Sequence, residues 1–273
     1  MAEFSGAVVV ITGVGSGIGR ATALLFGRLG ARVHASDLDG DAAERVRAEI
    51  EAWGGIAAAD PLDVTDAGAV EGLAQRVFAS AGAVDVLHNN AGVGNAASVE
   101  ATTLEDWRRV IDVNLMGTVH GVQAFVPRML RQGRPGHVVN TASMAGLVAS
   151  AELVPYSTSK FAVVGLSEAL NAELAPNGIR VTALCPGIID TDIVHSATYR
   201  GEIAAGAERI QRFYRERGAS PDVVAAAVVG VVRRKRLIQP VPYGHVLPLW
   251  LLHRVSPRAS QAVSRLMPRL DRR

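Results

Sequence analysis

Short apolar runs alternate with longer amphipathic stretches along most of the chain. The apolar runs are rich in valine, isoleucine and alanine and lack polar alternation, as expected of parallel strands covered by helices on both faces. The pattern predicts strands at 7–12, 32–37, 56–60, 84–89, 137–142, 180–185 and 237–241. It predicts helices at 17–29, 41–53, 67–80, 104–131, 156–175 and 221–234. This order predicts an α/β fold, a doubly wound parallel sheet of about seven strands.

The alternation continues without a repeat or a linker to about residue 240. We therefore expect residues 1–240 to form a single domain and residues 241–273 to form an apolar and basic C-terminal extension. The apolar run at 246–252 contains a proline and is far shorter than the roughly 20 residues that cross a bilayer. Ser256-Pro257 predicts the start of a short helix. Its apolar stripe would be Ala259, Ala262, Val263 and Leu266.

Composition is that of a globular protein. Of 273 residues, 49% are hydrophobic and 20% charged, and 28 basic residues nearly balance 26 acidic ones, so no nucleic-acid partner is expected. Cys185 is the only cysteine, which excludes an internal disulfide and fits a reducing compartment. The 7 histidines are scattered, and we expect no metal site. The N-terminus has no basic segment before its apolar run, so we expect a cytoplasmic protein.

A glycine-rich loop, Thr-Gly-Val-Gly-Ser-Gly-Ile-Gly at 12–19, follows the first predicted strand and opens the first predicted helix. Glycines allow a tight turn and a close approach of the backbone to a pyrophosphate, whose charge then meets amide donors at the helix N-terminus. In this strand–loop–helix context the motif predicts a dinucleotide site in a domain of Rossmann type. The candidate residues are Gly13, Ser16, Gly17, Ile18 and Gly19.

Asp37 ends the second predicted strand and bears on the choice between NAD and NADP. A carboxylate there accepts hydrogen bonds from both hydroxyls of the adenosine ribose and repels a 2′-phosphate. Ser36 and Ser16 offer no positive charge to such a phosphate. We therefore predict NAD as the cofactor. Asp37 could instead cap the next helix, a role for which Asp39 and Asp41 are also placed.

Lys160 stands out because, of 28 basic residues, only it and Lys235 are lysine. It follows Tyr156 by one helical turn, which would put phenol and ammonium on one helix face. A free tyrosine has a pKa of about 10, and a nearby cation is expected to lower that pKa toward the range of a general base. Ser143, upstream, offers a hydroxyl to a substrate oxygen. The same spacing also occurs on ordinary exposed helix faces.

From residue 5 to about residue 193 the chain resembles the short-chain dehydrogenase/reductase family. The matching motifs, in the order and spacing of that family, are the glycine loop, Asp63-Val64, Asn89-Asn90-Ala91-Gly92, Asn114, Ser143, Tyr156 with Lys160, and residues 186–191. The resemblance implies an oxidoreductase that transfers a hydride between a nicotinamide cofactor and an alcohol or ketone. It also implies dimers or tetramers.

The resemblance assigns a role to each matching residue. Tyr156 would be the general base for alcohol oxidation, and Ser143 would orient the substrate oxygen. Tyr156 and Lys160 would lie at the nicotinamide ribose, with Lys160 lowering the pKa of the phenol. Asn114 would anchor a water of a proton relay, or mark a helix kink. The other implied cofactor contacts are Asp63 and Val64 at the adenine, Asn90 at the ribose, and Ile189 and Thr191 at the nicotinamide end.

Other functions on related folds fit the sequence less well. A catalytically silent, NAD-sensing regulatory or binding protein would share the fold, but it would not need Asn114, Ser143, Tyr156 and Lys160 together. A nucleotide-sugar epimerase or dehydratase would usually carry a larger C-terminal domain and a differently spaced glycine loop. A serine hydrolase is excluded, because no Gly-x-Ser-x-Gly elbow follows a central strand.

Residues 192–218 follow the Pro-Gly motif, where the resemblance implies a substrate lid within the dinucleotide-binding and catalytic domain 1–240. Apolar and aromatic side chains here and near Ser143 suggest a lipophilic secondary alcohol or ketone as substrate. They are Ile193, Val194, Tyr199, Ile203, Ile210, Phe213, Tyr214, Leu147, Val148 and Leu153. The same side chains could instead merely pack the lid onto the domain.

Two further surfaces are candidates for contact with partners. The helices at 104–131 and 156–175 bear apolar residues beyond one core-facing stripe, which predicts a homodimer or homotetramer. The candidate interface residues are Phe125, Met129, Ala162, Leu166 and Leu170. The extension 241–273 could attach peripherally to an anionic membrane, or Trp250 and its neighbours could cover the substrate entrance or a partner subunit.

Overall fold

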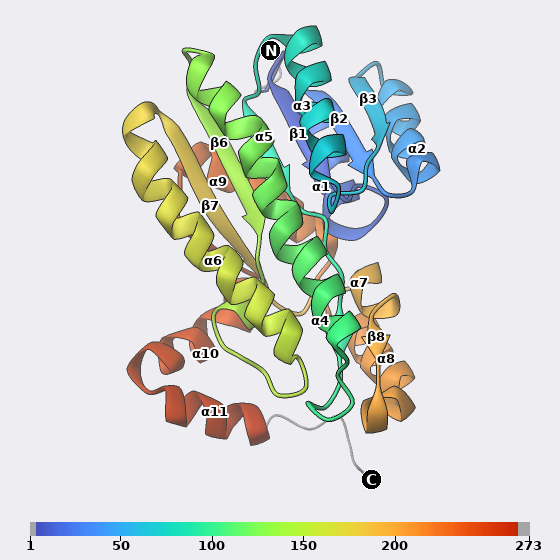
Figure 1. Ribbon diagram of the computed structural model, residues 1–273, viewed down its shortest axis with the longest axis vertical. Helices are drawn as coiled ribbons and strands as arrows, with labels where there is room; N and C mark the ends of the chain where they lie inside the picture. The colour runs from blue at the N-terminus through green and yellow to red at the C-terminus, as the bar shows by residue number, and fades with distance from the viewer. Residues whose placement is uncertain (1–3, 267–273) are drawn as a thin grey trace.

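The computed structural model describes residues 4–266 and contains one seven-stranded parallel sheet (Figure 1). The strands are β1 Val8–Thr12, β2 Arg32–Asp37, β3 Ile56–Pro61, β4 Val86–Asn89, β6 Gly136–Thr141, β7 Ile179–Pro186 and β9 Ile238–Val241. Their order is β3-β2-β1-β4-β6-β7-β9. The predicted doubly wound fold is confirmed, because the order reverses between β1 and β4 and helices cover both faces. Ligands of such sheets bind at the carboxyl ends of the strands near this reversal.

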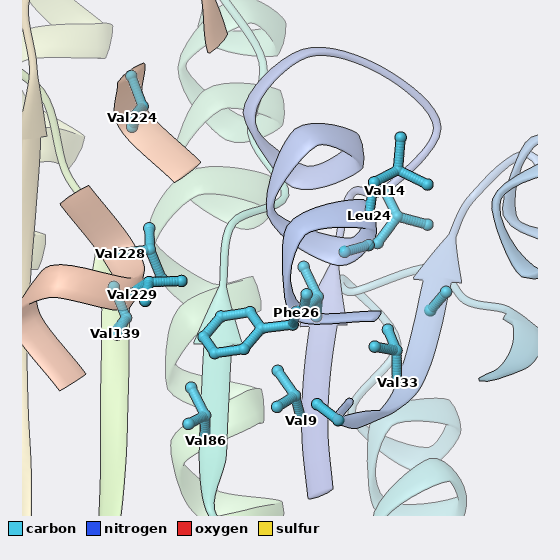
Figure 2. Close-up of a cluster of buried hydrophobic side chains, with 14 of the residues drawn as sticks. Val9, Val14, Leu24, Phe26, Val33, Val86, Val139, Val224, Val228 and Val229 are labelled. Atoms are coloured by element: carbon cyan, nitrogen blue, oxygen red, sulfur yellow. The ribbon is translucent and has the colours of Figure 1, made fainter. Parts of the chain in front are cut away.

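A hydrophobic core on each face of the sheet holds the helices in place. One face is covered by α1 Gly17–Arg28, α2 Gly40–Glu51 and α9 Pro221–Arg234, and the other by α3 Ala67–Ala81, α5 Gly117–Arg131 and α6 Val154–Leu174. Figure 2 shows the first core, where Phe26 of α1 lies over Val9 of β1 and Val86 of β4. Phe26 is completely buried, which contributes about 1.5–3 kcal/mol. This core fixes the start of α1 at the carboxyl end of β1.

The helix predicted at 104–131 is divided by one π-helical turn. Helix α4, Leu104–Ile111, begins with a capping box, in which Thr103 and Asp106 each accept a hydrogen bond from the other's backbone N–H. The π-turn spans Asp112–Met116 and leads into α5. A π-turn inserts an extra residue into the helix and is frequent at functional sites. Here it carries Asn114, which is buried.

The predicted lid folds into short elements that are fastened to the domain. They are α7 Asp192–His195, β8 Thr198–Tyr199, a 3₁₀ segment Gly201–Gly206 and α8 Ala207–Arg217. Strand β8 pairs with β5 Asn95–Ala96 in a separate two-stranded sheet. Arg200 donates two hydrogen bonds, of 2.7 and 3.0 Å, to the carboxylate of Asp106 in α4. Arg109 donates to the carbonyl of Gly94 and the hydroxyl of Thr198, so α4 holds both strands of the small sheet.

The C-terminal extension returns over the domain as α10 Tyr243–Val255 and α11 Pro257–Leu266. Val246 is completely buried, and Leu249 and Trp250 pack against a cluster that includes Leu147 and Val148. The extension therefore packs against the cluster that contains the segment after Ser143, and the choice between a cover over the substrate entrance and a membrane contact stays a prediction. No helix of residues 4–266 is both long and apolar enough to cross a membrane.

The structure describes the first part of the expected apolar stripe of the final helix. The helix begins at Pro257 as predicted, and Ala262 and Val263 lie exposed on it. The side chain of Leu266 and all residues from 267 on, including the last arginines, lie outside the described residues.

Two residues of the predicted oligomer interface are wrongly assigned. Phe125 and Met129 are each only 1% exposed, because they point from α5 into the core against the sheet. The sequence pattern did not show which apolar stripe of α5 faces inward. Ala162, Leu166 and Leu170 of α6 remain partly exposed and stay candidates for an interface.

Candidate active site

The glycine loop leaves room for a ligand at the carboxyl end of β1. Gly13 and Gly17 have φ angles of +71° and +51°, which side chains rarely adopt. A Cβ on Gly19 would lie 1.9 Å from the carbonyl oxygen of Gly13, so only glycine fits there. Ser16 is the N-cap of α1, and its side chain makes no capping hydrogen bond. Together these features give the loop the space and the free backbone N–H groups that a pyrophosphate needs beside the first turn of α1.

Asp37 lies against this loop at the end of β2. Its carboxylate accepts hydrogen bonds from the backbone N–H of Gly15 at 2.7 Å and of Asp39 at 3.0 Å. Asp39, not Asp37, caps α2, accepting from Asp41 and Ala42. The capping alternative for Asp37 is therefore wrong. A carboxylate oxygen can accept two hydrogen bonds, so both oxygens of Asp37 retain capacity for ribose hydroxyls.

Asn90 ties the loop to the neighbouring strands. Its side-chain amide donates to the carbonyls of Thr12 and Gly13, at 3.1 and 3.0 Å, and accepts from the hydroxyl of Thr141 at 3.3 Å. Its backbone N–H donates to the Thr12 hydroxyl. Asn90 therefore stabilises the conformation of the loop, and its side chain uses most of its hydrogen-bonding capacity in these contacts.

The expected adenine residues lie in the loop after β3. Asp63 is exposed, and one of its carboxylate oxygens accepts hydrogen bonds from the backbone and the hydroxyl of Thr65. Val64 is buried, and its carbonyl contacts Nδ1 of His120 at 2.8 Å. The loop is thus fixed while the second carboxylate oxygen of Asp63 has no hydrogen bond among residues 4–266.

Tyr156, Lys160 and Ser143 come together at the carboxyl ends of β6 and β7. Lys160 is 2% exposed, and its Nζ donates to the carbonyl of Thr141 at 2.9 Å and lies 5.7 Å from the centre of the Tyr156 ring. Ser143 follows β6 and accepts a hydrogen bond from the backbone of Ala145. The phenol and the ammonium do share one face of α6, as the four-residue spacing predicts.

The pKa of Tyr156 differs from the expected one. Burial raises it to about 12, although hydrogen bonding to Ser143 opposes the rise. Burial also lowers the pKa of Lys160 to about 8. Removing each group from water disfavours its charged form, and this is the largest cause of each shift. In the protein by itself the pKa of Tyr156 therefore lies above its ordinary value and not below it.

Asn114 joins the β4 loop to α6. Its side chain accepts from the backbone N–H of Val93 at 2.8 Å, donates to the Val93 carbonyl at 3.0 Å, and donates to the hydroxyl of Ser159 at 3.2 Å. A Cβ on Gly92 would lie 3.2 Å from Oδ1 of Asn114 and 3.5 Å from Nζ of Lys160. The absence of a side chain at Gly92 leaves space directly beside the ammonium.

The two residues predicted at the nicotinamide end take different places. The side chain of Ile189 is buried in the core with residues of α1 and α9, which the periodicity of a loop does not reveal. Thr191 lies against the glycine loop, since a Cβ on Gly17 would be 3.1 Å from Cβ of Thr191. The residue directly before α7 thus lies beside the start of α1.

Several residues at the site carried no recognisable signal in the sequence. Thr141 acts on Lys160 through its backbone carbonyl, which any residue would supply. Ser159 accepts from Asn114 and donates to the Tyr156 carbonyl. Tyr214 of α8, which is among the aromatic residues that the sequence places at the substrate, also raises the pKa of Tyr156. Among residues 4–266, no group of His, Cys, Asp and Glu could hold a metal ion.

Comparisons with known proteins agree with this geometry. The chain is 41% identical over 269 residues to the probable oxidoreductase EphD of Mycobacterium tuberculosis, covering 96% of this chain and 45% of that protein. It therefore spans about half the length of that relative. It is 42% identical over 191 residues to a 1-deoxy-11-beta-hydroxypentalenate dehydrogenase of Streptomyces exfoliatus, covering 69% of this chain and 70% of that one.

A solved structure has the same architecture. The crystal structure of a short chain dehydrogenase/reductase from Burkholderia phymatum in complex with NAD matches with a TM-score of 0.88 at 32% identity, over 95% of this chain and 96% of that one. The profile of the short chain dehydrogenase family matches residues 7–200, most of the α/β domain. The chain belongs to the short-chain dehydrogenase/reductase family.

Proposed function

We propose that the protein is an NAD-dependent dehydrogenase that interconverts a lipophilic secondary alcohol and its ketone. The observation that carries the proposal is the meeting of Ser143, Tyr156 and Lys160 beside a glycine loop with room for a pyrophosphate. Bound NAD would accept the hydride from the carbinol carbon.

Each side chain has one task in this reaction. Tyr156 takes the hydroxyl proton of the alcohol, and Ser143 donates a hydrogen bond to the substrate oxygen as negative charge develops on it. Lys160 binds the ribose hydroxyls, and its protonated form favours the phenolate of Tyr156. Asn114 holds Gly92 and α6 at a fixed separation through its bonds to Val93 and Ser159, and we assign it the water of a proton relay.

The choice of NAD follows from Asp37, which repels a 2′-phosphate and keeps lone pairs for the ribose hydroxyls. We assign the pyrophosphate to residues 13 and 16–19 with Thr191, the adenine to Asp63 and Val64, and the ribose side to the loop that Asn90 holds. Tyr156 and Lys160 complete the contacts at the nicotinamide ribose.

A lipophilic substrate is supported by the apolar cluster next to Ser143. Leu147 and Val148, which follow the catalytic serine, belong to a cluster against which Met144 and, from α10, Leu249 and Trp250 also pack. We therefore take residues 1–240 as the catalytic domain and the extension as a cover over its substrate entrance. We also propose a homodimer or homotetramer through α6, which light scattering would reveal as a mass above that of the monomer.

The test is a panel of secondary alcohols of increasing apolar size, each with NAD, followed by the absorbance of the reduced nicotinamide. Oxidation that rises with apolar surface supports the proposal. Binding of NAD in calorimetry without turnover of any alcohol would instead favour a cofactor-sensing protein on this fold. Failure to bind NAD at all would contradict both functions.

A further inference from the structure

His88 is a completely buried histidine that has no task in the proposed reaction. It lies in β4, and its Nε2 is 2.9 Å from the hydroxyl oxygen of Thr141 at the end of β6. Its Nδ1 is also buried and has no hydrogen bond among residues 4–266. Burial lowers the pKa of His88 to about 3, so the ring is neutral and one of its nitrogens carries a proton. A buried ring with one unpaired nitrogen calls for a specific explanation.

The neighbouring hydrogen bonds decide which nitrogen of the ring carries the proton. The side-chain amide of Asn90 donates to the carbonyls of Thr12 and Gly13, which fixes its orientation. The hydroxyl of Thr141 donates its single proton to Oδ1 of Asn90 at 3.3 Å. The bond between Thr141 and His88 is therefore donated by Nε2–H of the ring. Nδ1 is then left as an unpaired acceptor, so the ring is suited to donate and not to accept.

Thr141 connects the two halves of the site. Val86 and Val139 belong to the core under α1 and α9 (Figure 2), and side chains two residues further along each strand point to the same face. His88 and Thr141 occupy those two positions. The backbone carbonyl of Thr141, in contrast, accepts from Nζ of Lys160, which reaches it from α6 on the other face of the sheet. One residue thus serves the glycine loop through its hydroxyl and the ammonium through its carbonyl.

We propose that His88 and Thr141 form a positioning pair that keeps the glycine loop and Lys160 in the relative places that NAD binding requires. The inference rests on the proposed function. The ring donates to the hydroxyl and so directs the proton of that hydroxyl toward Asn90, which in turn binds the carbonyls of the loop. Neither residue of the pair is assigned a contact with the reacting atoms. Its loss should therefore weaken NAD binding and leave proton transfer by Tyr156 possible.

A second histidine–threonine pair in the same sheet provides a matched control. Nε2 of His137 in β6 is 2.8 Å from the hydroxyl of Thr182 in β7, and that hydroxyl donates to the carbonyl of Arg236. His137 is 4% exposed, and burial lowers its pKa to about 4. The chemistry is the same, but His137 is the second residue of its strand and so lies toward the amino ends, away from the glycine loop.

The first experiment compares Thr141→Val with Thr182→Val, each of which removes one hydroxyl and keeps the shape of the side chain. We expect both variants to melt below the wild type, since each leaves a buried histidine donor unpaired. Only Thr141→Val should raise the Kd for NAD in calorimetry, by about three- to tenfold, which corresponds to the loss of one hydrogen bond. Thr182→Val should bind NAD within about twofold of the wild type.

The second experiment tests the ring itself. His88→Met and His88→Gln have side chains of similar size, and only the glutamine can donate a hydrogen bond from near the place of Nε2. His88→Met should raise the Kd for NAD as Thr141→Val does, and His88→Gln should raise it less. Combining His88→Met with Thr141→Val should raise the Kd no further than the stronger single substitution, because both interrupt one chain of hydrogen bonds.

A Thr141→Val variant that melts lower yet binds NAD like the wild type would overturn the inference, because the pair would then be structural only. Additive effects on the Kd in the double variant, or equal weakening by Thr182→Val, would overturn it as well. If Thr141→Val does not fold, equal Kd values for His88→Met and His88→Gln would be the contradicting result. A wild type that does not bind NAD would instead refute the proposed function, and the inference would fail with it.

Discussion

At the scale of single residues, burial controls the charges at the site. Tyr156 and Lys160 lie one helical turn apart, yet the pKa of the phenol rises to about 12 and that of the ammonium falls to about 8. Catalysis by the phenolate therefore calls for positive charge in addition to that of Lys160. The oxidised nicotinamide ring, which is cationic, is suited to provide it at the moment of reaction.

The shifted pKa of Lys160 predicts a pH dependence of stability. Its ordinary value is 10.5, and its value in the folded protein is about 8. Between these pH values the unfolded chain keeps a proton that the folded protein has released, so the contribution of Lys160 to stability rises with pH in this window. Below about pH 8 both states carry the charge, and its burial destabilises the fold.

Denaturant unfolding of the wild type and of Lys160→Met at stepped pH checks this. The free energy of unfolding of the wild type, relative to the variant, should increase from about pH 8 to pH 10.5. A difference that stays constant across this window would show that burial does not shift the pKa.

Asp37 predicts cofactor preference. A like-charge contact with a 2′-phosphate in a partly dry site is expected to make NAD bind at least about tenfold tighter than NADP. Asp37→Arg should shift the preference toward NADP, while Asp41→Arg, four residues further on, should leave it unchanged. Calorimetry with both cofactors measures these affinities, and equal affinities in the wild type would remove the basis of the assignment.

At the scale of elements, the predicted lid, residues 192–218, is joined to α4 by a contact between residues distant in sequence. Asp106 is almost fully buried, and its pairing with Arg200 lowers its pKa to about 2. Asp106→Asn leaves the capping box partly intact but removes the charge opposite Arg200, so the lid should open more often. We expect a higher KM for the alcohol, an unchanged Kd for NAD and faster tryptic cleavage within 192–218. Arg108→Gln, at an exposed position of the same helix, is the control and should behave as wild type.

The sheet and its large helices were predictable from the sequence, because each strand and helix carries its own apolar period and end signals. All seven strands lie within about two residues of their expected limits. The lid elements α7, β8 and α8 were not predicted, since they are held by Arg200 and Arg109 contacts that join separate segments. The motif residues carry a local signal and could be identified from the sequence. The role of Ser159 and the burial of Ile189 depend on contacts between separate segments, so the sequence did not reveal them.

At the scale of the whole molecule, the extension completes the apolar cluster beside Ser143. Truncation before Tyr243 removes Val246, Leu249 and Trp250 from that cluster, exposing Leu147 and Val148. The truncated protein should therefore lose activity on apolar alcohols and melt at a lower temperature. Co-sedimentation with anionic liposomes tests the alternative: salt-sensitive binding that vanishes on truncation, with activity retained, would make the extension a membrane contact.

The central claim is that Tyr156 moves the substrate proton in an NAD-dependent oxidation, and one comparison tests it most directly. Steady-state reduction of NAD by the best secondary alcohol is measured for the wild type and for Tyr156→Phe, with NAD affinity determined for both by calorimetry. The account predicts that kcat falls by orders of magnitude while the Kd for NAD stays the same, because only the proton-transfer group is removed. A variant with near-normal turnover would contradict it.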